Sequence, residues 1–270
     1  MIQNDVNKQE DLTEEEFLEL VLEEQQKALA EERQRRLEGT KKTKRQTPLV
    51  RLIVWGMAFI LFFNTFAILF NIYSIPAIEF LKVSTALSAQ EDIQQYKKAV
   101  VEISTGDSKG TGFAISDDGY ILTNEHVIDD ALQLTVVFPD EGIYEAEVVA
   151  AYPEIDTALI KVTGVDLPHL NVAESYTPSA KEHMYFIGNP LYFTGIANEG
   201  TVIDWIKLDD WEQPVVMMQA PVYKGNSGSP VITNDGDVVG VVFATLKTEE
   251  HGKVGLFVPI NYFHKAMAQK

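Results

Sequence analysis

The stretch that decides the fold reads GTGFAISDDGYILTNEHVI and covers residues 110–128. Two short apolar runs, TGFAIS and YILT, flank an Asp-Asp-Gly turn at residues 117–119, and such a turn between apolar runs predicts a β-hairpin. His126 follows directly after the second run, so we expect its imidazole at the end of a strand. A lone histidine is more often structural than catalytic, and His126 taken alone leaves both interpretations open.

The same pattern of short β-branched runs separated by turns continues to residue 260. The predicted strands begin at Ala99, Thr111, Tyr120, Gln133, Glu145 and Thr157, and then at Met184, Gly200, Val215, Ser229, Asp237 and Val254. A polar stretch, residues 166–182, separates the two sets. Since no helical period lies between the strands, the sequence predicts an all-β sandwich or barrel arrangement in two similar halves, followed by a short helix over residues 261–270.

Asp156 stands in the motif EIDTALIKV, at the mouth of an apolar strand and after a turn at Pro153. A buried carboxylate needs a hydrogen-bond donor, because an unpaired buried charge is strongly unfavourable. The donor can be a backbone N–H of the turn, or an imidazole Nδ1–H whose tautomer the carboxylate would fix. The residues around Asp156 leave these two partners open.

Ser227 lies in GNSGSP, residues 225–230, where two glycines surround it ahead of an apolar strand. Glycine tolerates positive φ, so the N–H groups of Gly225 and Ser227 can point at one oxygen, as an oxyanion hole requires. An isolated motif of this kind would be an ordinary turn. The order His126, Asp156, Ser227 within one β domain favours a nucleophilic triad instead.

These motifs, together with IGNPL at residues 187–191 and VGLFVPIN at residues 254–261, resemble the trypsin-like serine proteases and, within them, the bacterial HtrA/Deg envelope proteases. The resemblance implies a chymotrypsin-like fold of two six-stranded antiparallel β-barrels with the active site between them. It implies that Ser227 attacks the scissile carbonyl, that His126 takes and returns the proton, and that Asp156 orients the imidazolium. No cofactor and no metal ion are expected.

Alignment by this resemblance also predicts the pocket for the side chain that precedes the scissile bond. Its walls fall on Pro221, Val222 and Tyr223, with Phe243, Ala244 and Thr245 on the opposite strand. None of the six is charged, so a Lys or Arg side chain would lose its hydration without a carboxylate partner. The expected preference is loose and aliphatic.

Three positions depart from the family pattern. Ser229 stands where many members have Gly, and Gln219 where many HtrA proteins have Asp. Asn226 replaces the Asp that, in digestive enzymes, pairs with a newly cut N-terminus, so we expect the uncut chain to be competent. The residues after the final helix leave no room for a PDZ domain, and control through such a module is not expected within this chain.

Residues 52–78 form an uncharged stretch that, as a helix, would span roughly 40 Å, against a bilayer core of about 30 Å. A cleaved signal peptide is the main alternative, because small residues follow at positions 84–89. The long polar region before the stretch favours an uncleaved anchor. Basic residues gather between Lys41 and Arg51, which predicts a cytoplasmic N-terminus and an outer or periplasmic β domain in a bacterial cell membrane.

Composition narrows the possible functions further. The chain of 270 residues has a net charge of −18, which argues against nucleic-acid binding, and its lack of cysteine excludes disulfides and a Cys nucleophile. The predicted organisation is a cytoplasmic helical arm (1–51), the anchor (52–78), a polar helical stem that holds the outer domain off the bilayer (79–98) and the protease domain (99–270). Residues 13–38 of the arm predict a helix, which either docks a partner or self-associates, or is simply solvated.

Two functions remain on these grounds. The first is a membrane-anchored serine endopeptidase that hydrolyses exposed or unfolded envelope proteins through an acyl-enzyme. The second is a proteolytically weak, chaperone-like or binding protein that retains the protease fold. The complete set of triad residues favours the enzyme.

Overall fold

The computed structural model of the protein describes residues 14–38, 48–106, 108–129, 131–190, 193–209 and 211–269, with side chains omitted at 14–17, 38 and 68–79. The chain divides into two compact units, Met1–Ile68 and Leu69–Lys270. Helix α2 contributes residues to both units. The β domain lies entirely within the second unit.

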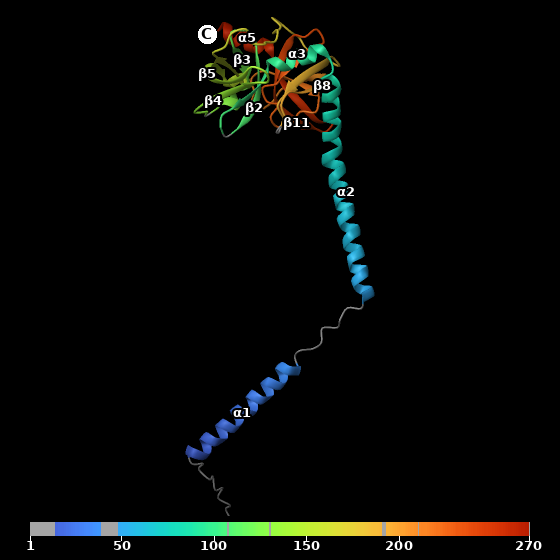
Figure 1. Ribbon diagram of the computed structural model, residues 1–270, viewed down its shortest axis with the longest axis vertical. Coiled ribbons are helices and arrows are strands. Elements are labelled where there is room, and N and C mark those ends of the chain that lie inside the picture. Colours follow the sequence, from blue (N-terminus) through green and yellow to red (C-terminus); the bar gives the residue numbers. More distant parts are fainter. Residues whose placement is uncertain are drawn as a thin grey trace, which may run out of the picture. The chain divides into compact units, whose positions relative to one another are not determined.

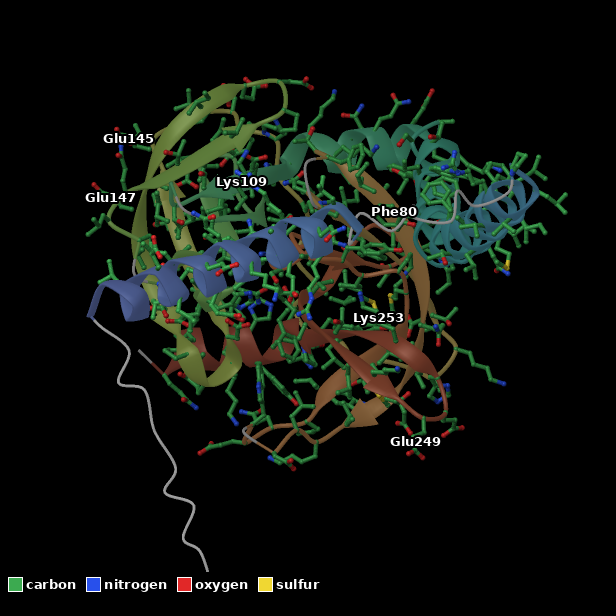
Figure 2. The ribbon with its side chains drawn as sticks, turned by 90° about the horizontal axis from the view of Figure 1, so that it is seen from below. Phe80, Lys109, Glu145, Glu147, Glu249 and Lys253 are labelled. Atoms are coloured by element: carbon green, nitrogen blue, oxygen red, sulfur yellow. The ribbon has the colours of Figure 1, made fainter. Side chains whose placement is uncertain are left out.

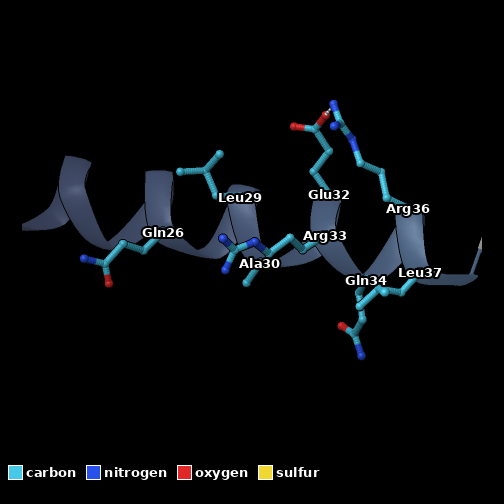
Figure 3. Close-up of a pocket in the computed structure, with 8 residues that line it drawn as sticks. All are labelled: Gln26, Leu29, Ala30, Glu32, Arg33, Gln34, Arg36 and Leu37. Atoms are coloured by element: carbon cyan, nitrogen blue, oxygen red, sulfur yellow. Dashed lines mark hydrogen bonds and ion pairs between the residues drawn. The ribbon is translucent and has the colours of Figure 1, made fainter.

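Helix α1 (Glu14–Glu38) lies within the predicted arm, and residue 13, where the predicted helix begins, lies outside the described residues. All its described side chains are exposed, including several leucines. Glu32 and Arg36 form an ion pair of 3.0 Å along one side of the helix (Figure 3).

Helix α2 (Pro48–Leu87) contains the apolar stretch. Its segment Pro48–Ala67 is long and apolar enough to cross a membrane, with a mean hydropathy of 1.9, and is the one such segment among the described residues. None of that stretch is buried, which differs from a core helix of a soluble domain. The basic cluster at residues 41–45 lies outside the described part of the chain.

The predicted stem, residues 79–98, is helical but is not a free spacer. It comprises the end of α2, a short turn and α3 (Glu91–Ala99). Phe80, Ser84 and Leu87 are buried, and their spacing of four and three residues places them on one face of α2. This face and α3 pack along the β domain (Figure 1). The polar composition of the stem did not indicate that a few of its side chains would be buried against the β domain.

Twelve strands form two closed six-stranded antiparallel barrels, which confirms the predicted fold class. The first barrel contains β1 (Val100–Ser104), β2 (Lys109–Ala114), β3 (Tyr120–Thr123), β4 (Leu134–Phe138), β5 (Gly142–Tyr152) and β6 (Thr157–Val162) in the order β1-β2-β3-β6-β5-β4. The second contains β7 (His183–Gly188), β8 (Ile196–Ile206), β9 (Val215–Gln219), β10 (Pro230–Ile232), β11 (Val238–Thr248) and β12 (Gly252–Pro259) in the order β10-β11-β12-β9-β8-β7. Short helices α4 (Glu125–Ile128), η1 (Pro153–Ile155) and α5 (Ile260–Ala268) complete the domain.

Each barrel has its own apolar core, and a third core joins them. Ile103 and Phe138 lie within the first barrel, and Met218 and Phe257 within the second. The joining core combines side chains from both barrels with α3 and α5, among them Ile93, Phe113, Leu122, Val241 and Phe263. Apolar burial of this extent holds the two barrels as one body, so residues on facing loops keep a defined separation.

Candidate active site

His126 lies on the one-turn helix α4, which follows β3. Val127 and Ile128 of the same turn are buried in the first barrel, so they anchor the backbone while the imidazole stays at the surface. The His126 side chain is 48% exposed. The predicted position, at the end of a strand, is where the structure places it.

Asp156 meets His126 from the facing turn of the same barrel. It directly follows η1 and has a left-handed backbone, with φ +43°. His126 Nδ1 lies 2.7 Å from Asp156 Oδ2 and 2.9 Å from Oδ1, and the backbone N–H of His126 donates to Oδ1 at 3.0 Å. Asn124 Nδ2 donates to the carbonyl oxygen of Asp156 at 2.7 Å. Asp156 thus has both kinds of donor that the sequence left open.

The Asp156 carboxylate changes the proton affinity of the imidazole. The hydrogen bond to Asp156 raises the pKa of His126 above its ordinary value, partial burial opposes this, and the charges of Asp156 and Glu125 add to the increase. A carboxylate acceptor at Nδ1 favours the tautomer with its proton on that nitrogen. Nε2 is then left as the basic atom.

Ser227 lies between β9 and β10, on a loop of the second barrel that is tied to the first. Thr111 of β2 donates its backbone N–H to Ser227 O at 2.9 Å and its hydroxyl to Gly225 O at 2.7 Å. Gly228 has φ +87°, and a Cβ there would lie 1.8 Å from Thr111 O. Glycine is therefore required at this contact between the barrels.

The hydroxyl of Ser227 is directed to Phe243, whose carbonyl oxygen accepts a long hydrogen bond of 3.4 Å. Among the described residues, the structure shows no hydrogen bond between Ser227 and His126. The N–H groups of Gly225 and Ser227 also have no acceptor within the described part of the chain. Gly225 has φ +98°, as the third residue of a type II turn requires, and both N–H groups remain available to an oxyanion.

A hollow of about 390 Å³ lies beside the His126–Asp156 pair. Its other lining residues are Pro153, Glu154, Trp211, Phe243 and Ala244. The rings of Trp211 and Phe243 contact each other at a centroid distance of 4.6 Å. Sequence reasoning missed Trp211. A tryptophan in the polar turn LDDWEQP, between two strands, was the available signal.

The six predicted pocket residues do not line one hollow. Phe243 and Ala244 border the hollow beside His126, whereas Pro221, Val222 and Tyr223 border a second one of about 340 Å³ together with Gln219, Ala220 and Lys253. Thr245 is among the lining residues of neither. Alignment of the sequence could not show which side of residues 221–223 faces the substrate. It also could not show that Lys253 of β12 lies beside them.

Val222 borders the second hollow but is itself largely buried. Its side chain is 4% exposed and belongs to the core of the second barrel, next to Gly255. Lys253, which the sequence did not place near these residues, lines the same hollow as residues 221–223. Its positive charge still disfavours a basic substrate side chain there.

Two of the departures from the family pattern meet at Gly188. Asn226 and Ser229 are buried, and a Cβ on Gly188 would lie 2.5 Å from Asn226 Oδ1 and 2.2 Å from Ser229 Oγ. The missing side chain at Gly188 thus makes room for the extra side chain at Ser229. The Asn226 amide and the Ser229 hydroxyl have no hydrogen-bond partner among the described residues.

Two antiparallel six-stranded barrels, with a His–Asp pair on one and a serine loop on the other, define a chymotrypsin-like serine protease fold. Residues 110–241, which lie in the β domain, match the family model of the trypsin-like peptidase domain. Within the described ranges, no group of three or more His, Asp or Glu side chains is placed to hold a metal ion.

Several known proteins are similar to the chain. A probable periplasmic serine endoprotease, DegP-like, from Pseudomonas fluorescens is 38% identical over 136 residues, which are 50% of this chain and 29% of the relative. A protein of the same description from Chlamydia pneumoniae is 32% identical over 167 residues, 60% of this chain and 32% of the relative. The chain therefore spans about a third of the length of these curated relatives.

Solved structures agree with the fold. Rv3671c from M. tuberculosis, as an inactive serine-to-alanine mutant, has a TM-score of 0.59 at 26% identity, covering 68% of this chain and 92% of that one. The serine endoprotease from Yersinia pestis has a TM-score of 0.58 at 27% identity, covering 66% of this chain and 64% of that one.

Proposed function

We propose that the protein is a membrane-anchored serine endopeptidase that cleaves exposed or unfolded segments of envelope proteins. The observation that carries this proposal is the 2.7 Å contact between His126 Nδ1 and Asp156, beside a serine loop tied to the same barrel through Thr111. The trypsin-like family match and the DegP-like relatives support the reaction class.

In the proposed reaction, Ser227 Oγ rotates from Phe243 O toward His126 Nε2 and attacks the carbonyl carbon of the scissile peptide. The hydroxyl proton passes to Nε2, and the negative charge moves to the carbonyl oxygen, which the N–H groups of Gly225 and Ser227 stabilise. His126 then gives its proton to the leaving amine, and the acyl-enzyme remains. Water repeats the sequence, with its proton again taken by His126, and releases the carboxylic acid.

The substrate preference follows from the surroundings of the triad. Trp211, Phe243 and Ala244 present apolar surface beside His126, and Lys253 adds a positive charge to the neighbouring hollow. Aliphatic side chains gain from such surface, whereas Lys and Arg lose hydration and meet repulsion near Lys253. Unfolded proteins expose aliphatic segments, which is why we propose them as the substrate class.

The anchor assignment rests on the apolar segment Pro48–Ala67 and on relatives described as periplasmic. We propose that the cluster of positive charge between Lys41 and Arg51 lies in the cytoplasm, and that residues 79–270 lie on the outer side of the membrane.

Active-site labelling tests the proposed chemistry. The full chain in detergent micelles should react with a fluorophosphonate probe, because only an activated serine does so at a useful rate. Ser227→Ala should abolish labelling, and His126→Ala should reduce it by orders of magnitude while the chain stays folded. Wild-type protein that folds but neither labels nor cleaves unfolded casein would contradict the proposal.

A weak protease or binding protein is the second candidate, and one observation favours it. Ser227 Oγ bonds to Phe243 O rather than to His126, so the described geometry is not ready for attack. Suppression of aggregation by Ser227→Ala at the wild-type level, with no labelling of the wild type, would support this alternative.

A further inference from the structure

The loop before Ser227 has few hydrogen bonds of its own. Among the described residues, two backbone bonds lie within residues 220–226, from Val222 N–H to Ala220 O (2.9 Å) and from Asn226 N–H to Tyr223 O (3.1 Å). One further bond ties the loop to β2. The buried side-chain amide of Asn226 adds none. The conformation of the loop must therefore depend strongly on side-chain packing.

Tyr223 contributes to that packing, beside the buried Val222, through contacts with two other elements. Its ring meets the ring of Phe80 edge-to-face, at a centroid distance of 4.8 Å and an interplanar angle of 74°. Lys253 Nζ of β12 lies 5.0 Å from the centroid of the same ring. Both geometries are favourable for aromatic and cation–π contacts. Figure 2 labels Phe80 and Lys253, on α2 and on the second barrel respectively.

Phe80 lies outside both barrels, on the last turns of α2. Its side chain is 7% exposed, so the contact with Tyr223 excludes water. Leu87 lies on the same helix face and is equally buried, but it belongs to the core that joins the barrels. The two side chains thus differ in what they support: Phe80 supports the loop before Ser227, and Leu87 supports the body of the domain.

We propose that Phe80 is a positioning residue for the peptidase reaction. It holds Tyr223, whose carbonyl oxygen closes the turn that presents the N–H of Gly225 to the oxyanion. A displaced Tyr223 would shift this turn, and with it the oxyanion donor, without contact to the triad. The inference rests on the proposed function and extends it, because it assigns part of the active-site order to a segment outside the protease barrels.

Phe80→Ala in the full chain, in detergent, tests the inference through two measurements. Hydrogen exchange of amides 220–229 should rise about tenfold, while strands β11 and β12 keep their protection. The kcat for an aliphatic peptide substrate should fall about tenfold, with KM changed less than twofold, because Phe80 acts on the transition state rather than on substrate binding.

Two further variants separate positioning from general stability. Phe80→Met keeps apolar volume and a favourable sulfur–aromatic contact, so it should restore most of the loop protection and of kcat. Leu87→Ala removes an equally buried side chain from the same helix face. It should lower the melting temperature but leave loop exchange and kcat near wild type at temperatures where it is folded.

The inference is overturned if loop exchange in Phe80→Ala equals that of the wild type, or if Leu87→Ala has the same local effect. A wild-type chain that neither cleaves peptides nor reacts with the probe would refute the proposed function instead. Loop exchange is independent of activity, so it would still decide whether Phe80 holds the loop.

Discussion

His126 determines the pH dependence of the proposed reaction, because it must be neutral to accept a proton. Its hydrogen bond to Asp156 raises its pKa above the ordinary value of 6.5, so kcat/KM should increase with pH and reach half its plateau above 6.5. Asp156→Asn removes the charge and should move this midpoint down, with a loss in kcat of about four orders of magnitude. A pH–rate profile of both chains on one peptide measures this.

The same shift has the opposite effect on stability. A histidine whose pKa is raised in the folded state contributes stability that is fully present below its unfolded pKa of about 6.5 and is lost as pH rises through the folded pKa. As pH rises through the folded pKa of His126, kcat/KM should therefore increase while the stability that protonated His126 contributes is lost. A wild-type midpoint below 6.5, or one that Asp156→Asn leaves in place, would contradict the assigned pair.

Asn226 and Ser229 allow a second prediction, on the stability of the serine loop. Asn226→Asp would bury a carboxylate at a site that is 1% exposed, where the Asn226 amide has no hydrogen-bond partner among the described residues, so the melting temperature should fall markedly. Ser229→Ala removes an unpaired buried hydroxyl and should leave stability unchanged or raise it by up to about 1 kcal/mol.

Thermal unfolding of the full chain in detergent compares both variants with the wild type. An Asn226→Asp variant as stable as the wild type would reveal a donor that pairs with position 226. A group that can pair with a carboxylate at position 226 would weaken the argument from the neutral Asn226 amide. That argument is that a newly cut N-terminus has no ion-pair partner there.

At the residue scale, the sequence could indicate candidate site residues that stand in short motifs. His126, Asp156 and Ser227 each stand in a local pattern, and the choice that the sequence left open for Asp156, between a backbone N–H and an imidazole donor, resolves to contacts with both groups of His126. Trp211 and Lys253 were not predicted. They reach their hollows from distant strands and turns, and such contacts depend on barrel closure rather than on spacing along the chain.

At the scale of elements, the turn between β8 and β9 carries the third prediction. Trp211 stands on this turn, contacts Phe243 and borders the hollow beside His126. Trp211→Ala should remove apolar contact surface for substrate and lower kcat/KM for peptides with large aliphatic residues about tenfold. Peptides with alanine near the scissile bond should lose less, because they do not reach the ring.

A peptide library digested by the full chain and by Trp211→Ala makes this comparison. Trp205 is a suitable control, since it also lies in the second barrel, is partly exposed and is not among the lining residues of either hollow. An equal loss for all peptides in Trp211→Ala would indicate a fold defect. Cleavage mainly after Lys or Arg in either chain would contradict the proposed apolar preference.

Some strands and turns could be predicted from the local sequence pattern alone. The Asp117-Asp118-Gly119 turn and the strands β3, β6 and β9 appear as the sequence predicts, because hairpin turns and β-branched runs are local signals. For the stem, residues 79–98, the local pattern was not sufficient to predict the packing. Its helices were expected, but their packing depends on a few side chains such as Phe80, whose partner Tyr223 lies more than a hundred residues away in the chain.

At the scale of the whole molecule, charge is distributed unevenly along the chain. Residues 1–51 carry ten basic side chains, five of them between Lys41 and Arg51, whereas residues 79–270 have no arginine and many carboxylates. Segments flanking a membrane span retain Lys and Arg on the cytoplasmic side. This asymmetry, together with the apolar segment Pro48–Ala67, predicts that the N-terminus is inside and the protease domain outside the membrane.

Protease protection in cells tests this orientation. A chain with different epitope tags at its two ends, carrying Ser227→Ala to prevent self-cleavage, is expressed in spheroplasts and exposed to added proteinase. The C-terminal tag should disappear while the N-terminal tag survives on a small membrane-bound fragment, and detergent should expose both. Protection of both tags would place the β domain inside. Because the basic cluster is the physical cause, replacing Lys41, Lys42, Lys44 and Arg45 by Gln should weaken the asymmetry and yield a mixed population.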